Sequence, residues 1–207
     1  MNSEIESIVP INKRQAEPAI EALKNAFKET YSVKYYLPNG VNREKAIRCF
    51  LSIGVQTGIK YGEVYATSSN YEGVAIWMYS DNLPITTWKM LGSVSPMAVL
   101  GFVRNGGLKM MRVGEYVEKA HKRLAPSKHW YLQTISVDPK FQGKGYAGKL
   151  IRPMLAKIDI QHLPCYLETF EEKNASIYER FGFKVIERSP IPQTPLENFA
   201  MLRDAVP

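Results

Sequence analysis

Ile135-Ser-Val-Asp-Pro-Lys-Phe-Gln-Gly-Lys-Gly-Tyr-Ala-Gly-Lys149 is the most informative stretch of this chain. An apolar segment, expected to be a strand, runs into a short loop, and the loop leads into a run of glycine and lysine that opens a helix. Glycines let a ligand approach the backbone closely, and successive N–H groups at a helix start bind phosphate groups. The stretch therefore predicts a site for an anionic, phosphate-bearing cofactor.

The nucleoside-triphosphate loop is one motif to test against this stretch. It requires four residues between its glycines, followed by Lys and then Ser or Thr. Here Lys144 lies between Gly143 and Gly145, and no hydroxyl residue follows to bind magnesium. The sequence therefore excludes this loop.

The dinucleotide fingerprint G-x-G-x-x-G is met in its letters by Gly143, Gly145 and Gly148, and Glu168 lies twenty residues beyond the last glycine. That motif begins where a strand ends, however, whereas residues 138–142 intervene before the first glycine. It also belongs to a doubly wound domain, and no run of alternating strands and helices surrounds it here. The dinucleotide interpretation is therefore disfavoured.

The same stretch resembles the coenzyme A loop of the GCN5-related N-acetyltransferase (GNAT) family. The loop itself is Gln142-x-x-Gly145-x-Ala147, preceded by Ile135-Ser-Val137. Downstream, Tyr166-Leu-Glu-Thr169, Asn174 and Tyr178-Glu-Arg-Phe-Gly-Phe183 follow in the order and spacing of that family. The first and last of these downstream motifs are similar to the branch that contains the puromycin-type antibiotic acetyltransferases. The motifs lie in roughly the last third of the chain, and their shared order makes the resemblance specific.

The resemblance implies an α/β (α+β) GNAT fold, in which helices flank a mixed central β-sheet. It implies a single N-acetyltransferase domain over residues 1–207, with an acetyl-CoA-binding core at 130–188. The chain departs from the family in a helical insert at 84–128, between the third and fourth strands, and in Ala147, where many members have glycine.

Hydrophobic periodicity and turn residues predict the individual elements. We expect a strand at 5–11, a helix at 17–27, a loop at 31–40 and a helix from Asn42, its cap, to 61. A hairpin at 63–67 and 73–79 precedes two insert helices, 86–104 and 108–124, split by Asn105-Gly106-Gly107. The expected elements that follow are a strand at 130–137, a helix at 146–159 bent at Pro153, a strand at 165–169, a helix at 174–181, and strands at 183–187 and 199–203.

The cofactor contacts are assigned by the resemblance. Main-chain amides of the loop would hold the pyrophosphate of acetyl-CoA, and the loop consists of Gln142, Gly143, Lys144, Gly145, Tyr146, Ala147 and Gly148. Ile135, Ser136 and Val137 would pair with the pantetheine arm as if it were an added strand, because in the family this strand splays from its neighbour. An N–H near Val137 would bind the thioester oxygen as charge develops on it.

The resemblance implies two catalytic residues. Tyr178 would protonate the departing sulfur, since a phenol of pKa ~10 stays protonated at neutral pH. Glu168 would act as the base, or hold an ordered water, because an alkylammonium cannot attack until it loses a proton. Each has a structural alternative: Tyr178 as core, and Glu168 as a solvated carboxylate or one that only binds a cationic substrate. Asn174 either contacts the cofactor arm or caps its helix.

The composition narrows the remaining classes. With 45% hydrophobic residues the 207-residue chain is globular rather than disordered. Its net charge of +7 comes from scattered basic residues, with no arginine-rich run, so an anionic cofactor explains it as well as nucleic acid does. Cys49 and Cys165 suit a reducing, cytoplasmic compartment. His121, His129 and His162 lack the spacing of a metal site. His129, beside Trp130, could approach the site, but a surface role is expected for it.

Targeting and membrane signals are absent from the sequence pattern. The N-terminus is acidic and has no apolar core of signal-peptide length. No segment reaches the ~18 uninterrupted apolar residues of a membrane span. We therefore expect no membrane partner.

These features predict an acetyl-CoA-dependent N-acetyltransferase that acts on the primary amine of a small molecule by direct attack in a ternary complex, as a monomer or homodimer. Apolar residues of the insert either wall an acceptor pocket or form the insert's own core; they are Trp88, Met90, Met97, Phe102, Met110 and Met111. A non-catalytic coenzyme A-binding sensor is the alternative, against which Tyr178 and Glu168 both argue. A basic nucleic-acid-binding module lacks a recognisable reading helix or stacking motif.

Overall fold

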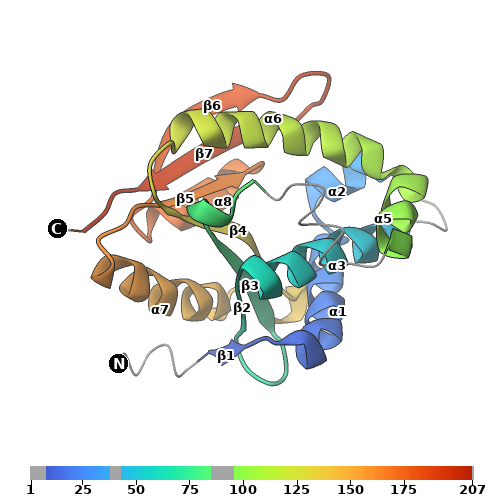
Figure 1. The fold of residues 1–207 in the computed structure, drawn as a ribbon, viewed down its shortest axis with the longest axis horizontal. Coiled ribbons are helices and arrows are strands. Elements are labelled where there is room, and N and C mark those ends of the chain that lie inside the picture. Colours follow the sequence, from blue (N-terminus) through green and yellow to red (C-terminus); the bar gives the residue numbers. More distant parts are fainter. Residues whose placement is uncertain (1–7, 38–42, 85–95, 207) are drawn as a thin grey trace.

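The computed structural model describes residues 8–37, 43–84 and 96–206, and within them the strands form one seven-stranded sheet (Figure 1). The strand order is β1-β2-β3-β4-β5-β7-β6. Every neighbouring pair is antiparallel except β4 and β5, which are parallel, so the sheet is mixed. The strands are β1 (Val9–Pro10), β2 (Gly62–Ala66), β3 (Gly73–Tyr79), β4 (Trp130–Val137), β5 (Cys165–Thr169), β6 (Lys184–Pro190) and β7 (Glu197–Arg203).

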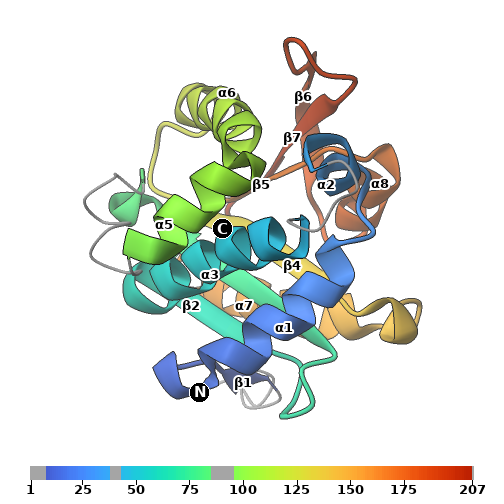
Figure 2. The same cartoon turned by 90° about the vertical axis from the view of Figure 1, so that its right-hand side faces the viewer.

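Helices cover both faces of this sheet. The helices are α1 (Ala16–Phe27), α2 (Tyr31–Tyr36), α3 (Arg43–Tyr61), α5 (Pro96–Phe102), α6 (Leu108–Leu124), α7 (Tyr146–Ile160) and α8 (Glu172–Glu179). In Figure 2, α1, α3 and α5 lie in front of the sheet and α7 lies behind it. Helix α6 lies over β7 on the side of α1 and α3. The fold is therefore a three-layer arrangement of helices, sheet and helix.

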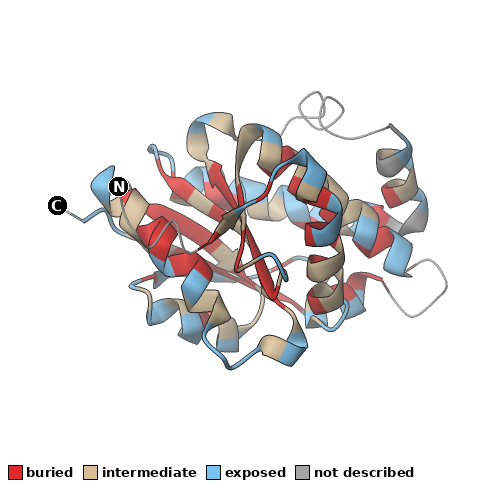
Figure 3. Ribbon diagram, turned by 90° about the horizontal axis from the view of Figure 1, so that it is seen from below, coloured by how far each residue is buried: buried red, intermediate tan, exposed pale blue. Residues whose placement is uncertain are grey.

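The side chains of β3 alternate between the two faces of the sheet, and so pack against the helices on both sides. Val74, Ile76 and Met78 face the cluster formed with α1 and α3, whereas Ala75 and Trp77 face the cluster formed with α7. Because successive side chains of a strand point to opposite faces, a strand buried on both sides needs apolar residues at every position. Figure 3 shows the resulting burial along the strands and on the inward sides of the helices.

Gln133 is an extra residue in β4. Ile76 pairs with Thr134 and Trp77 pairs with Leu132, so Gln133 has no partner on β3. Such a bulge bends the strand that carries it and increases its twist. Beyond the bulge β4 diverges from β5, and these two fully described strands pair only at Trp130–Cys165 and Tyr131–Tyr166. The side of β4 that faces β5 is consequently open from residue 132 to 137.

Most of the expected elements are confirmed. The strands expected at 130–137 and 165–169 have those bounds, the hairpin and the helix at 17–27 agree within a residue, and the last two strands are longer than expected. The helical segments of the insert lie between β3 and β4, as expected. Asn42, and residues 5–7 of the first strand, lie outside the described residues; the described part pairs with β2 only at Val9–Pro10.

Two expectations were wrong. Residues 31–36, expected in a loop, form α2, because Val33 and Tyr36 are buried against α1 and α3 and hold a six-residue helix that its own propensity would not. Asn105-Gly106-Gly107 does not split the insert, since residues 103–107 form a π-helical turn that leads directly into α6. Phe102 occupies the space beside Gly107, where a side chain would clash with its ring.

Among the described residues, no helix combines the length with the apolar character that crossing a bilayer requires.

Candidate active site

The loop between β4 and α7 presents free backbone N–H groups. Gly143 and Gly145 have φ of +75° and +82°, a left-handed conformation that residues other than glycine rarely adopt. The Lys149 N–H donates to the Gly145 carbonyl oxygen, which closes the first turn of α7. Within this described loop, the amides of residues 143–148 donate no backbone hydrogen bond. Unpaired amides at a helix start are the groups that commonly bind anions in proteins.

A second set of unpaired backbone groups lies along β4. The Asp138 N–H donates to the Glu72 carbonyl oxygen at 2.9 Å, on the side of β3. N–H directions alternate along a strand, so the N–H groups of Ile135 and Val137 point to the opposite side, where β5 has diverged. Gln142 donates from Nε2 to the Val137 carbonyl oxygen at 3.0 Å and so ties the loop to the end of the strand. The open edge is thus positioned directly before the loop amides.

These two features border one cleft of about 1150 Å³. It is lined by all but one of the residues expected to bind the cofactor: Ile135, Ser136, Val137, Gln142, Gly143, Gly145, Tyr146, Ala147, Gly148, Asn174 and Tyr178. Lys144 is the exception, because its ammonium lies over the Phe141 ring, 5.5 Å from the centroid. The loop amides and the open strand edge are suited to a phosphate group followed by an extended chain.

Basic side chains at this cleft were missed by the sequence analysis. They are Lys34, Lys149, Arg152, Lys173 and Arg180, contributed by α2, α7, α8 and the turn after α8. The Arg152 guanidinium lies over the Phe181 ring at 5.3 Å. Lys149 and Arg152 are three residues apart at the start of the expected helix, so the sequence alone could have predicted that they lie on the same side of it. The others come together only through the tertiary fold.

A second cavity, of about 790 Å³, meets the cleft. It lies between α1, α2 and α3 on one side and α5, α6 and β4 on the other. Of the insert residues proposed to wall it, Phe102, Met110 and Met111 do so, Met97 is 73% exposed, and Trp88 and Met90 lie outside the described residues. The residues that border both cavities are Thr30, Ile135, Ser136, Glu171, Asn174 and Tyr178.

Glu168 ends in the second cavity. Burial raises the pKa of this carboxyl to about 8, although the nearby phenols of Tyr131 and Tyr166 favour its charged form. Oε1 of Glu168 and the Tyr166 hydroxyl are both enclosed and make no hydrogen bond of ordinary geometry. A carboxyl with such a pKa exchanges a proton near neutral pH, as a general base must. Glu168 is therefore not the solvated strand-end carboxylate of the structural alternative.

Tyr178 and Asn174 lie one turn apart on α8 and face both cavities. Burial raises the pKa of Tyr178 to about 12, so the phenol remains a proton donor at neutral pH. Asn174 does not cap its helix, because the cap position is Glu171 and the Asn174 N–H donates to the Glu171 carbonyl oxygen. Its side chain is left to the cavities.

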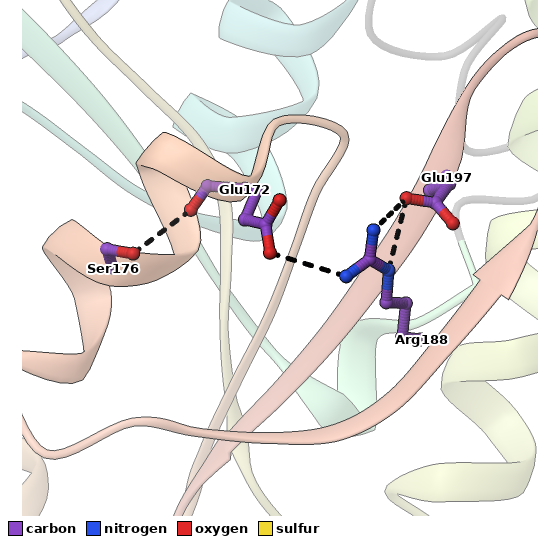
Figure 4. Close-up of polar contacts among 4 residues, drawn as sticks. All are labelled: Glu172, Ser176, Arg188 and Glu197. Carbon is purple, nitrogen blue, oxygen red and sulfur yellow. Dashed lines mark hydrogen bonds and ion pairs between the residues drawn. The ribbon is translucent and has the colours of Figure 1, made fainter.

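An ion network fixes the outer side of α8 (Figure 4). The Arg188 guanidinium of β6 binds Glu172 of α8 at 3.3 Å and Glu197 of β7 at 2.6 Å. It also lies over the Phe199 ring at 4.9 Å. These groups are about half exposed, so each pair contributes little stability by itself. They connect the start of the helix that carries Tyr178 to β6 and β7.

His121 and His129 form a buried pair, which corrects the expected surface role of His129. Their Nε2 atoms lie 2.7 Å apart, and Nδ1 of His129 lies 2.6 Å from the Ser127 carbonyl oxygen. A carbonyl only accepts, so Nδ1 of His129 carries hydrogen and its Nε2 accepts from His121. The His121 ring stacks on Tyr166 with a centroid distance of 4.4 Å. No sequence signal pairs these residues, since one ends a helix and the other precedes a strand.

The histidine pair predicts an acid-sensitive stability. Burial lowers the pKa of His121 to about 3 and also lowers the pKa of His129. Below the ordinary value of ~6.5 the unfolded chain binds protons that the folded chain refuses, so stability is lost as pH falls below ~6.5. His121→Gln keeps a donor for His129 but does not titrate. We expect its free energy of unfolding to fall less between pH 7 and pH 5 than that of the wild type, by up to about 2 kcal/mol. Urea unfolding at both pH values measures this, and an equal loss in both proteins would contradict it.

Comparison with known proteins adds to this geometry. Residues 100–185 match a model of the GNAT acetyltransferase domain. A stretch of 54 residues, 26% of the chain, is 50% identical to an uncharacterized N-acetyltransferase of Schizosaccharomyces pombe, and the chain spans only 22% of that relative's length.

Solved structures resemble the whole chain. A histone acetyltransferase HPA2-related protein of Corynebacterium glutamicum has a TM-score of 0.66 at 19% identity and covers 97% of each chain. The Drosophila melanogaster polyamine N-acetyltransferase, which forms N-acetylagmatine, has a TM-score of 0.60 at 14% identity, over 94% of this chain and 97% of that one. Such identities show a shared fold. The chain therefore has the GNAT fold, and its residues 100–185 match the acetyltransferase domain of that family.

Proposed function

We propose that this chain is an acetyl-CoA-dependent N-acetyltransferase that acetylates the primary amine of a small molecule by direct attack in a ternary complex. The observation that carries the proposal is the junction of the two cavities. One has anion-binding amides and an open strand edge, the other has a carboxyl of raised pKa, and they meet at Ile135, Ser136, Asn174 and Tyr178. A donor and an acceptor bound in the two cavities would come into contact there.

The residues of the first cavity fit acetyl-CoA. Amides 143–148 would hold its diphosphate, and the Ile135 and Val137 backbone would pair with its pantetheine arm. Bound there, acetyl-CoA supplies the acetyl thioester. The Val137 N–H would hold the thioester oxygen, which gains charge during attack, and a donor fixed in advance lowers that barrier.

The residues of the second cavity would handle the protons. Glu168 would accept the proton of the incoming ammonium, because its pKa of about 8 suits proton uptake near neutral pH. Tyr178, at the junction, would donate its proton to the departing sulfur. The two roles require groups whose pKa values lie far apart, and burial provides this separation.

Tyr178→Phe tests the proton donor. The change removes one hydroxyl from a ring that otherwise packs against Phe183. We expect kcat to fall by roughly 10- to 100-fold while the Kd for acetyl-CoA changes less than about twofold. Tyr116→Phe is the matched control, because that phenol donates to Ser189 away from both cavities. Unchanged turnover in Tyr178→Phe would remove Tyr178 from the mechanism.

Two measurements test the function as a whole. Acetyl-CoA should raise the melting temperature of the protein, whereas NAD should not. Release of free thiol from acetyl-CoA in the presence of an amine panel should then show transfer. Stabilisation by acetyl-CoA without thiol release for any amine would favour the non-catalytic sensor, and stabilisation by NAD alone would restore the dinucleotide interpretation.

The proposal also covers the domain organisation, the family branch, the compartment and the oligomeric state of the protein. We treat the chain as one acetyltransferase domain, with 84–128 as an insert and 130–188 as the cofactor-binding core, supported by a single sheet that uses strands from both halves. The motif at 166–169 supports a place near the puromycin-type acetyltransferases, and the substrate of the Drosophila protein supports a small amine. Both cysteines are free, which suits a reducing compartment such as the cytoplasm. We expect a monomer or a homodimer.

A further inference from the structure

We propose that the acceptor is a primary amine with a single positive charge and an apolar body, such as an alkylamine or arylalkylamine, rather than a polyamine or an aminoglycoside. This inference rests on the proposed acetyl transfer, whose acceptor cavity it describes. The walls of the cavity, the pairing of its carboxylates and its unpartnered polar atoms carry it.

More of the surface of the second cavity is apolar than polar. Aromatic and aliphatic side chains from α1, α3, α5 and α6 form an apolar part of the lining, among them Phe27, Phe50, Leu51, Phe102, Met110 and Val113. The Phe50 and Phe102 rings lie against each other with centroids 6.0 Å apart. Burying a methylene group in such surroundings is favourable, whereas burying an unpaired charge or an unpartnered hydroxyl is costly.

The carboxylates of this cavity leave one place for a cation. Four carboxylates among the described lining residues border it, and three of them already bind lysines. Asp81 lies 3.6 Å from Lys128, Glu118 lies 2.7 Å from Lys122, and Glu171 lies 2.8 Å from Lys173. The fourth, Glu168, has no ion-pair partner among the described residues. A second ammonium on the acceptor would have no free anion.

The rim of the cavity disfavours polycations further. Lys122 and Lys128 border it and are exposed. Each is paired with a carboxylate of the rim, so the two ion pairs give the rim no net negative charge that would attract a polycation, and the net charge of +7 on the chain opposes its approach. An amine with one charge and an apolar body experiences the least of this repulsion.

Two of the described lining residues carry polar oxygens that have no hydrogen-bond donor. Oε1 of Glu168 and Oε1 of Gln133 are enclosed and accept no hydrogen bond, and both side chains line the cavity. Gln133 is the bulge residue of β4, and it is one of the residues that line the cavity. An ammonium has three N–H donors and could donate to both oxygens if a small movement of the two side chains brought them to the cavity surface. Without a ligand these buried acceptors are costly, which indicates that the cavity is built for a head group with donors.

Two amines of equal length separate the alternatives. n-Octylamine and heptane-1,7-diamine have the same number of non-hydrogen atoms and differ by a distal methyl group against a distal ammonium. With acetyl-CoA saturating, we expect kcat/KM from thiol release to be at least about 100-fold higher for octylamine. 2-Phenylethylamine should resemble octylamine, and spermidine should resemble the diamine. Equal rates, or a preference for the diamine, would overturn the inference.

A binding measurement separates this inference from the proposed reaction. Calorimetric titration of the two amines into the protein saturated with coenzyme A reports the cavity's preference whether or not transfer occurs. Tighter binding of octylamine supports the inference even if thiol release fails, and that failure would count against the acetyl transfer alone. Tighter or equal binding of the diamine, or no binding of either amine, would overturn the inference.

Met110→Glu should change the preference, since Met110 is a partly buried wall residue of α6. A carboxylate there supplies the missing second anion. We expect the octylamine-to-diamine ratio of kcat/KM to fall at least about tenfold. Met110→Gln, of the same size but uncharged, is the control and should keep the preference. If Met110→Glu fails to fold, the wild-type comparison of the two amines still decides the inference.

Discussion

Glu168→Gln should lower kcat by about 100- to 10,000-fold, because the amide keeps the size of the side chain but cannot accept the proton of the ammonium. The Kd for acetyl-CoA should stay close to the wild-type value, since Glu168 borders only the second cavity. Thiol release measures the first quantity and calorimetry the second. Glu187→Gln is the control, because Glu187 lies on the edge strand β6, away from both cavities, and its carboxylate binds Arg123 of α6.

The pH profile gives an independent test of Glu168. A base must be deprotonated to act, so wild-type kcat/KM should rise with pH to a limb near pH 8, set by the raised pKa of this carboxyl. The acceptor's own ammonium titrates at a higher pH, and the two limbs can be separated. In Glu168→Gln the lower limb should disappear. A variant that keeps both its turnover and the lower limb would show that another group is the base.

Glu168→Gln should raise the stability of the protein while it lowers kcat. A carboxyl whose folded pKa is raised from 4.5 to about 8 opposes folding increasingly as pH rises between those values. Glu168→Gln removes this opposition, so the variant should gain more in melting temperature over the wild type at pH 8 than at pH 5. A change that lowers kcat while raising stability at pH 8 is typical of a functional buried charge rather than of a structural one.

Gly145→Glu should weaken acetyl-CoA binding by at least about 100-fold, since a negative charge would face the diphosphate where the loop amides converge. Space is not the reason: a Cβ at Gly145 would meet no atom within 4 Å. The backbone adds a smaller effect, because φ of +82° costs a residue with a side chain about 1–2 kcal/mol. Thermal shift and calorimetry with acetyl-CoA measure the loss.

Two further substitutions at Gly145 separate charge from strain. Gly145→Ala carries only the backbone cost, and Gly145→Gln adds the bulk of glutamate without its charge. We expect Ala to bind acetyl-CoA best, Gln next and Glu least, with the largest step between Gln and Glu. If Glu and Gln bound equally well, the diphosphate would lie elsewhere.

Secondary structure could be predicted from the sequence where the local residue pattern and burial in the folded protein favour the same element. The eight residues of β4 and the five of β5 are rich in aromatic, aliphatic and β-branched residues, and their bounds were predicted as the structure has them. The glycines of the loop could be recognised as important in the sequence, and the structure shows the reason: Gly143 and Gly145 have positive φ values that other residues rarely adopt. Helix α2 was not readable, because six residues are too few to show a helical period and its stability comes from burial of Val33 and Tyr36.

The acceptor side of the site was the least predictable. The bulge at Gln133 depends on the register between β3 and β4, which no single strand's sequence reveals. His121 and His129 meet because α6 returns to the sheet, and the spacing that suggested no metal site contains no information about such a contact. The motif at 166–169 drew attention to Glu168, but its raised pKa results from burial that only the fold creates.

The origin of the two cavities in the chain has an evolutionary consequence. The loop amides and the open strand edge of the first come from one continuous segment, the end of β4 and the loop after it, whereas the second is walled in part by side chains of helices that lie far away in the sequence. Mutations in those helices can therefore reshape the choice of acceptor while the donor half stays intact. For the proposed acetyltransferase, selection could change the choice of amine in small steps while the proposed acetyl-CoA site stays unchanged.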